Sequence, residues 1–155
     1  LETMISDFLV VSQNVDGLHQ RAGSKNIKCL HGDIFVNRCL DCRKLSDSNL
    51  LDFPEPVSCE SCGSLYRPGV VWFGESLDKR SLQDSWQAAE RCDLFLSVGT
   101  AASVQPAASL IDVAKEAGAY VVELNPNGTY ASAGVDLIIN EPSEVFFPRL
   151  LKAFG

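Results

Sequence analysis

The sequence has little basic charge and no long hydrophobic run. Its 155 residues contain 13 lysines and arginines against 20 aspartates and glutamates, so the formal net charge is −7. A protein that binds nucleic acid mainly through phosphate contacts needs the opposite balance, and we therefore expect no direct nucleic-acid partner. The longest apolar stretches have the length of strands, so the sequence predicts no membrane-spanning helix.

Two common phosphate-binding motifs are also missing. The sequence contains neither G-x-G-x-x-G, the fingerprint of many dinucleotide-binding dehydrogenases, nor the G-x-x-x-x-G-K-(S/T) of P-loop enzymes. It has no internal repeat and no low-complexity tract. These absences disfavour a hydride-transferring dehydrogenase and a P-loop enzyme, and any nucleotide that binds must be held by other contacts.

Four of the six cysteines form two pairs, Cys39-x-x-Cys42 and Cys59-x-x-Cys62. Two such turns brought together make a closed site of four thiolates, the ordinary environment of a structural zinc ion. Two disulfides or a redox dithiol are the alternatives, but nothing in the sequence indicates an oxidising compartment. A closed ligand shell has no open position, so we expect Zn²⁺ to stabilise the fold while the chemistry lies elsewhere. We also expect a cytoplasmic or other reducing location.

The order of apolar segments predicts an α/β protein. Because strands alternate with helices in βαβ units, we expect a Rossmann-like parallel sheet with helices on both faces. This domain comprises residues 1–34 and 67–155, and a small inserted zinc-binding module comprises residues 35–66. The expected strands are residues 8–11, 34–39, 93–98, 120–124 and 136–139. The expected helices are residues 78–91, 106–117 and 143–154, and a helical turn is expected at residues 18–22. We expect a loop-rich segment at residues 43–58 and an extended segment at residues 65–75.

Three expected strands end in small or amide residues. Ligands of open parallel sheets bind at the carboxyl ends of the strands, so these ends predict a nucleotide site along one sheet edge. Thr100 or Ser103 can also cap the helix that follows. The strand ends are Gln13-Asn14-Val15-Asp16, Gly99-Thr100-Ala101-Ala102-Ser103 and Asn125-Pro126-Asn127.

The sequence has two histidines, His19 and His31. A single histidine is more often a hydrogen-bonding or core residue than a catalytic one. His31 is the better catalytic candidate because it lies near the junction of the two expected modules, where clefts form.

These motifs together resemble the sirtuin family. Residues 12–19 (SQNVDGLH) with Ala22-Gly23 are similar to the sirtuin segment T-Q-N-(I/V)-D-x-L-H…A-G, and His31-Gly32 is similar to its H-G. The paired Cys-x-x-Cys motifs resemble the zinc module of the family. Residues 67–75 (RPGVVWFGE) resemble its R-P-x-V-V-x-F-G-E, most closely that of the deacylase branch.

The resemblance continues through the second half of the chain. Gly99-Thr100, followed by Val104 and Pro106, resembles the sirtuin G-T-S-x-x-V-x-P, and Asn125 resembles its last ribose-contacting asparagine. The motifs follow the order of the family over residues 8–148.

The resemblance implies NAD-dependent removal of acyl groups from lysine side chains of proteins or peptides, with release of nicotinamide and an O-acyl-ADP-ribose. It implies that His31 is the general base that takes a proton from a ribose hydroxyl, with Asn14 and Asp16 in the nicotinamide pocket. The implied cofactor-binding residues are Gln13, Asn14, Val15, Asp16, Gly99, Thr100, Ala101, Asn125, Pro126, Asn127 and Ser143. The implied substrate-binding residues are Val71, Trp72, Phe73, Gly74 and Glu75, near which the peptide pairs as an added strand.

The chain departs from the family pattern at three points. The opening strand and the G-A-G-x-S loop of the family are absent, and Ala101 stands where the family usually has Ser. We therefore expect that the full-length protein is a sirtuin, and that this chain by itself is less stable and weakly active. Titration of the chain with NAD tests this expectation, because tight binding would show that the missing loop is not needed. Cys29 and Cys92 match no ligand position and are expected to be buried.

Two other functions are consistent with the residues. The first is a zinc-stabilised module that binds peptides without catalysis, through the Trp72-Phe73 segment. The second is a thiol redox protein that uses Cys39 and Cys42.

Overall fold

The computed structural model of the chain describes residues 1–46 and 56–154. The chain divides into two compact units: residues 6–81 with Glu2 form one, and residues 82–155 with Leu1 and residues 3–5 form the other. The loop-rich segment expected at 43–58 lies partly outside the described residues. The expected domain boundaries stay a prediction.

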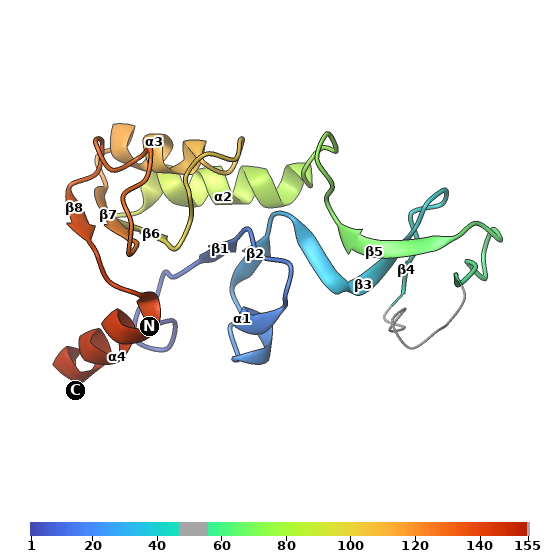
Figure 1. Cartoon of the computed structure of the whole chain (residues 1–155), viewed down its shortest axis with the longest axis horizontal. Coiled ribbons are helices and arrows are strands. Elements are labelled where there is room, and N and C mark those ends of the chain that lie inside the picture. The colour runs from blue at the N-terminus through green and yellow to red at the C-terminus, as the bar shows by residue number, and fades with distance from the viewer. Residues whose placement is uncertain (47–55, 155) are drawn as a thin grey trace. The chain divides into compact units, whose positions relative to one another are not determined.

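The first unit begins with a short parallel pair of strands, β1 (Val10–Ser12) and β2 (Ile27–Cys29) (Figure 1). The short helix α1 (Leu18–Arg21) lies between them in the chain and confirms the expected helical turn. β2 was not predicted, because its three residues, with Lys28 in the middle, do not form an apolar run. The backbone N–H of Leu30 extends the pairing by donating to the carbonyl of Ser12 at 2.9 Å.

The rest of this unit contains an antiparallel sheet in the order β4 (Leu45–Ser46), β3 (Gly32–Cys39), β5 (Tyr66–Val70). The pairing of β3 with β5 shifts register between Asp33 and Asn37, which indicates a bulge. The two strands approach closely at the glycines: a Cβ atom on Gly32 would lie 2.1 Å from the carbonyl oxygen of Gly69. Of the extended segment expected at residues 65–75, only β5 (Tyr66–Val70) is a strand.

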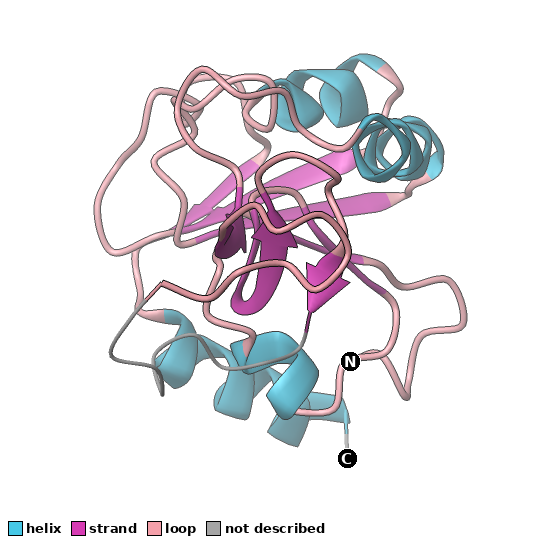
Figure 2. Cartoon of the chain, turned by 90° about the vertical axis from the view of Figure 1, so that its right-hand side faces the viewer, coloured by secondary structure: helices cyan, strands magenta, loops and turns pink. Residues whose placement is uncertain are grey.

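The second unit contains a three-stranded parallel sheet in the order β6 (Leu94–Val98), β7 (Tyr120–Leu124), β8 (Leu137–Ile139). Its helices are α2 (Lys79–Arg91), α3 (Ser109–Glu116) and α4 (Ser143–Phe154). Figure 2 draws the strands of the chain in magenta and its helices in cyan. The helix α3 packs against β6 and β7, and the indole N–H of Trp86 on α2 donates to the hydroxyl of Ser109 on α3 at 3.4 Å.

The helix expected at 106–117 is shorter than predicted. It begins at Ser109, because residues 106–109 form a tight turn in which the N–H of Ser109 donates to the carbonyl of Pro106 at 3.2 Å. Ala117 is the exposed C-cap, and Ala119 is buried after it. The core of this unit joins α3 to β7 through Leu110, Ile111, Ala114, Val121, Val122 and Leu124, all buried.

The predicted α/β class and the parallel pairing of strands are confirmed. The expectation that three strand ends share one sheet edge is wrong for the described residues. β1 belongs to the two-stranded sheet, whereas β6 and β7 belong to the other parallel sheet. None of the helices in the described part of the chain is long and apolar enough to cross a membrane.

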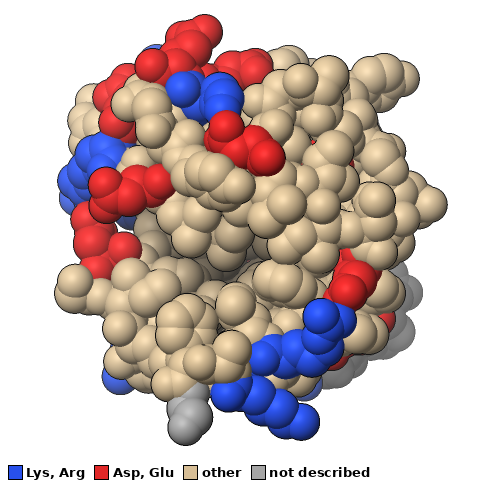
Figure 3. Space-filling view, turned by 90° about the vertical axis from the view of Figure 1, so that its left-hand side faces the viewer, with Lys and Arg blue, Asp and Glu red and all other residues tan. Residues whose placement is uncertain are grey.

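Charged side chains of both signs occur on the face drawn in Figure 3, where most of the surface is uncharged. Some of the charges in the second unit are paired: Arg149 donates to both carboxylate oxygens of Glu141 at 2.8 Å. Lys115 likewise pairs with Asp136.

Candidate functional site

The loop that follows β1 is held by its own side chains. The buried hydroxyl of Ser12 accepts the N–H of Asn14 at 3.1 Å, and the carboxylate of Asp16 accepts the N–H of Leu18 at 3.0 Å. Gly17 has a φ of 62°, a left-handed conformation that glycine adopts without strain. These contacts fix the backbone of residues 13–16, the first group of expected cofactor-binding residues.

His31 lies against this loop. Its Nδ1 atom is 2.8 Å from the carbonyl oxygen of Gln13. A carbonyl oxygen can only accept a hydrogen bond, so Nδ1 carries the proton and Nε2 of the neutral ring keeps a free lone pair. This tautomer is the one that a general base needs, because Nε2 can take a proton from a ligand.

The backbone around His31 joins the loop to β5. The N–H of Val71 donates to the carbonyl of His31 at 2.8 Å, and the N–H of Ile34 donates to the carbonyl of Val15 at 2.9 Å. His31 is thus fixed on the ring side by Gln13 and on the backbone side by Val71. The catalytic roles of His31, Asn14 and Asp16 stay predictions that this arrangement supports.

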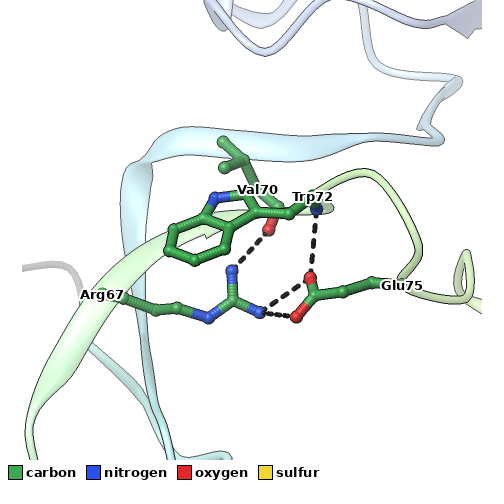
Figure 4. A network of polar contacts seen from close by, with 4 residues as sticks. All are labelled: Arg67, Val70, Trp72 and Glu75. Atoms are coloured by element: carbon green, nitrogen blue, oxygen red, sulfur yellow. Dashed lines mark hydrogen bonds and ion pairs between the residues drawn. The ribbon is translucent and has the colours of Figure 1, made fainter.

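The residues expected to bind substrate form a turn after β5 (Figure 4). Trp72 and Phe73 are exposed, and Phe73 is 99% exposed. Glu75, in contrast, uses both carboxylate oxygens to accept hydrogen bonds from the guanidinium of Arg67, at 2.6 and 2.8 Å. Arg67 was not predicted as a site residue, although an arginine in an otherwise uncharged strand is a signal that it needs a partner.

The four cysteines of the two pairs come together as predicted. Their Sγ atoms all lie within 4.8 Å of one another, and those of Cys39 and Cys62 are 3.4 Å apart. A zinc ion with four thiolates at about 2.3 Å needs sulfur atoms about 3.8 Å apart, so this cluster fits a tetrahedral site. The residues therefore suit Zn²⁺ as a structural ion.

Short backbone turns place these thiols. The N–H of Cys39 donates to the carbonyl of Lys44 at 2.9 Å, and the N–H of Cys59 donates to the carbonyl of Ser64 at 2.6 Å. Each Cys-x-x-Cys segment is thus closed as a tight turn, with Cys39 and Cys59 buried. The geometry explains why the spacing alone was enough to predict the site.

The two cysteines outside this cluster are half-buried, whereas full burial was expected. Burial raises the pKa of both thiols. The Sγ of Cys29 also accepts a hydrogen bond from the side-chain amide of Gln20 at 3.0 Å. A raised pKa leaves less of the reactive thiolate, so we expect neither residue to act as a nucleophile or a metal ligand.

The second unit presents another set of polar groups at the carboxyl ends of β6 and β7. The side-chain amide of Asn125 donates to the carbonyl of Thr100 at 3.0 Å, and the N–H of Gly99 donates to the carbonyl of Leu124 at 3.0 Å. The carbonyl of Asn125's side chain accepts the N–H of Asn127 at 3.2 Å. Asn125 therefore bridges two strand ends and orders the loop after β7.

The hydroxyl of Thr100 accepts the N–H of Ala102 at 3.2 Å, so it closes a local turn. The predicted capping of the next helix is wrong, because the N-cap of α3 is Ala108, without a side-chain cap. Ala101 lies inside this turn. Ser143 is the first residue of α4.

Glu123 is a polar residue that the sequence interpretation missed. It is only 1% exposed in β7, where its Oε2 atom accepts the hydroxyl of Ser132 at 2.7 Å. Among the described residues, its Oε1 atom has no hydrogen-bond partner. The signal was a charged residue inside the apolar run of residues 120–124.

Comparison with known proteins gives a consistent result. The sequence profile described as the Sir2 family matches residues 1–106. The chain is 42% identical over 154 residues to an NAD-dependent protein deacylase of Leptospira interrogans, and 45% identical over 142 residues to one of Aquifex aeolicus. These matches cover 98% and 91% of this chain but only 63% and 59% of the relatives.

Solved structures agree in fold. The structure described as Sir2 bound to acetylated peptide has a TM-score of 0.89 at 31% identity, covering 96% of this chain and 64% of that one. A Sir2 homologue in complex with NAD has a TM-score of 0.87 at 39% identity, covering 96% and 60%. The chain thus spans about three fifths of the length of the proteins that it matches.

Proposed function

The chain belongs to the Sir2 family, and we propose that it supplies the base, the nucleotide contacts and the zinc module of an NAD-dependent protein deacylase. The acyl-lysine side chain of a protein or peptide is the proposed substrate. The relatives are named for this activity, and one similar structure holds an acetylated peptide.

The contact between His31 and Gln13 carries the proposal. The carbonyl of Gln13 lies 2.8 Å from Nδ1 and keeps the proton there, so Nε2 is the ring atom that can accept a proton. We propose that Nε2 takes the proton of a ribose hydroxyl, while Asn14 and Asp16 bind nicotinamide. NAD, when bound, supplies the ribose carbon that accepts the acyl oxygen as nicotinamide leaves.

The other polar strand ends are assigned to the adenosine half of NAD. Gly99 has a φ of 59°, and in the part of the chain that the structure describes no atom lies within 4 Å of the place of an added Cβ. A ligand therefore has room to approach the backbone. Asn125 keeps a free N–H on its amide group after donating to Thr100. Ser143 and the segment of residues 125–127 complete this proposed set.

The zinc site has a structural role in this proposal. Four cysteine ligands leave no coordination position for a substrate, so the ion would tie β3 to the segment after it. A reducing compartment such as the cytoplasm suits free thiolates, and we propose such a location.

The test is nicotinamide release by the protein that carries this chain. We expect release only when both NAD and an acetyl-lysine peptide are present, as followed by chromatography of nicotinamide and mass spectrometry of the peptide. Peptide binding without any nicotinamide release would instead indicate the non-catalytic peptide-binding module. The exposure of Trp72 and Phe73 is expected for both functions and does not favour that alternative.

A further inference from the structure

The segment after β5 ends in a tight turn that side-chain packing does not hold. The N–H of Glu75 donates to the carbonyl of Trp72 at 2.9 Å, and Gly74 has a φ of 87°, which glycine provides without strain. Phe73, between them, is 99% exposed. An exposed turn of this kind needs another source of rigidity.

That source is a pair of charged side chains, which we call the Arg67–Glu75 clamp. Figure 4 shows the guanidinium between the turn and the end of β5. Its Nη2 donates to both carboxylate oxygens of Glu75 at 2.6 and 2.8 Å, and its Nη1 donates to the carbonyl of Val70 at 2.9 Å. The carboxylate also accepts the N–H of Trp72 at 3.0 Å. The clamp therefore fixes the backbone at both ends of Val71.

The guanidinium of the clamp is shielded from water, whereas its carboxylate is partly exposed. The side chain of Arg67 is only 8% exposed, and its guanidinium lies 4.7 Å from the centre of the Trp72 ring. A buried cation is costly unless it is paired, so Arg67 holds Glu75 firmly. The pKa of Glu75 lies below its usual value because the N–H of Trp72 and the guanidinium of Arg67 stabilise its carboxylate.

The fixed segment is bonded to the proposed catalytic residue. The N–H of Val71 donates to the carbonyl of His31 at 2.8 Å. The carboxylate of Glu75 acts on the backbone of the turn through Arg67 and through the N–H of Trp72.

We infer that Arg67 and Glu75 are positioning residues that hold the Val71–Gly74 backbone ready to pair with a peptide, so that the clamp determines peptide affinity. This inference rests on the proposed function. The expectation that Glu75 itself contacts the substrate stays a prediction.

The test compares steady-state kinetics of Glu75→Gln with those of wild type. We expect the KM for an acetyl-lysine peptide to rise at least about tenfold, because charge-assisted hydrogen bonds are lost. The kcat and the KM for NAD should change less than about threefold. Glu90→Gln, an exposed carboxylate on α2, is the matched control and should leave all three values unchanged.

A second variant separates positioning from stability. Glu75→Gln leaves a buried guanidinium without its counter-charge, which can destabilise the unit. Arg67→Met/Glu75→Gln removes both charges and keeps much of the volume, so we expect recovered thermal stability but the same raised peptide KM. A folded double variant with wild-type peptide KM overturns the inference, as does a fall in kcat with an unchanged KM.

The clamp and the proposed function can fail separately. If wild type releases no nicotinamide, the proposed function fails. The inference about the clamp is then tested by comparing the peptide affinity of wild type and of the two variants, measured by fluorescence polarisation. Weaker binding by both variants supports the clamp. Equal binding by wild type and variants, or no binding by any of them, overturns it.

Discussion

The Nδ1 atom of His31 lies 2.8 Å from the carbonyl oxygen of Gln13. This contact selects one tautomer of the ring and leaves Nε2 as the basic atom. If His31 is the base, as proposed, a backbone carbonyl orients its ring.

Replacing His31 tests its proposed role as the general base. We expect His31→Ala to lower kcat/KM for NAD-dependent nicotinamide release by about 10²- to 10⁴-fold, the usual contribution of a general base. The zinc content should not change. His19→Ala, an exposed imidazole on α1, is the control and should remain within about twofold of wild type. Retention of most of the activity by His31→Ala contradicts its assignment as the base.

The four-cysteine cluster predicts one zinc ion per chain. We expect inductively coupled plasma mass spectrometry to find this ratio in protein purified without chelator, and Cys39→Ala to lose the metal. Cys92→Ala, a half-buried cysteine in the other unit, should keep it. A wild-type protein that folds without any stoichiometric metal contradicts the prediction and favours the redox dithiol.

The close approach of Gly32 and Gly69 predicts a large loss of stability on substitution. Gly32 has a φ of 83°, and an added Cβ would lie 2.1 Å from the carbonyl of Gly69. Strain at positive φ costs about 1 kcal/mol, and a backbone clash adds about 1–3 kcal/mol. We therefore expect Gly32→Ala to lower the free energy of unfolding by about 2–4 kcal/mol.

The control for this clash is Gly23→Ala in the same unit. Gly23 has a φ of 96°, but no atom of the described residues lies within 4 Å of the position that its added Cβ would take. Only the strain of about 1 kcal/mol is therefore expected. Urea denaturation measures both variants. Equal losses for the two substitutions show that the contact between β3 and β5 is not as tight as described.

Low pH should lower the stability of the second unit, because Asp136 becomes protonated. Its pKa lies below the usual value because Lys115 pairs with it and the N–H of Val121 donates to it at 2.8 Å. A carboxyl with a depressed folded-state pKa contributes stability above the unfolded pKa of about 3.9, and this contribution disappears as the pH falls through the folded pKa.

We therefore expect Asp136→Asn to be less stable than wild type at pH 7, with a difference that narrows below a pH of about 4. Thermal unfolding followed by circular dichroism across this pH range measures the effect. Glu116→Gln, an exposed carboxylate at the end of α3, should show no such narrowing. A difference that does not depend on pH contradicts the linkage.

Local signals account for the features that were predicted correctly. The Cys-x-x-Cys spacing is itself the geometry of a ligand turn, so the cluster of Cys39, Cys42, Cys59 and Cys62 followed directly. The strand of residues 120–124 and the helix of residues 143–154 have the predicted bounds, because their periods are complete within one element. The start of α3 was wrong because turns with i+3 hydrogen bonds precede it.

The sequence by itself therefore determined the α/β class, the zinc ligands and His31 as the candidate base, since spacing and element order carry that information. Only the tertiary structure showed that the carbonyl of Gln13 selects the tautomer of His31, and that the guanidinium of Arg67 donates hydrogen bonds to the carboxylate of Glu75. The first contact joins the ring of His31 to a carbonyl eighteen residues away, and the second joins β5 to the turn that follows it. Pairings of this kind are set by three-dimensional packing, to which no sequence period corresponds.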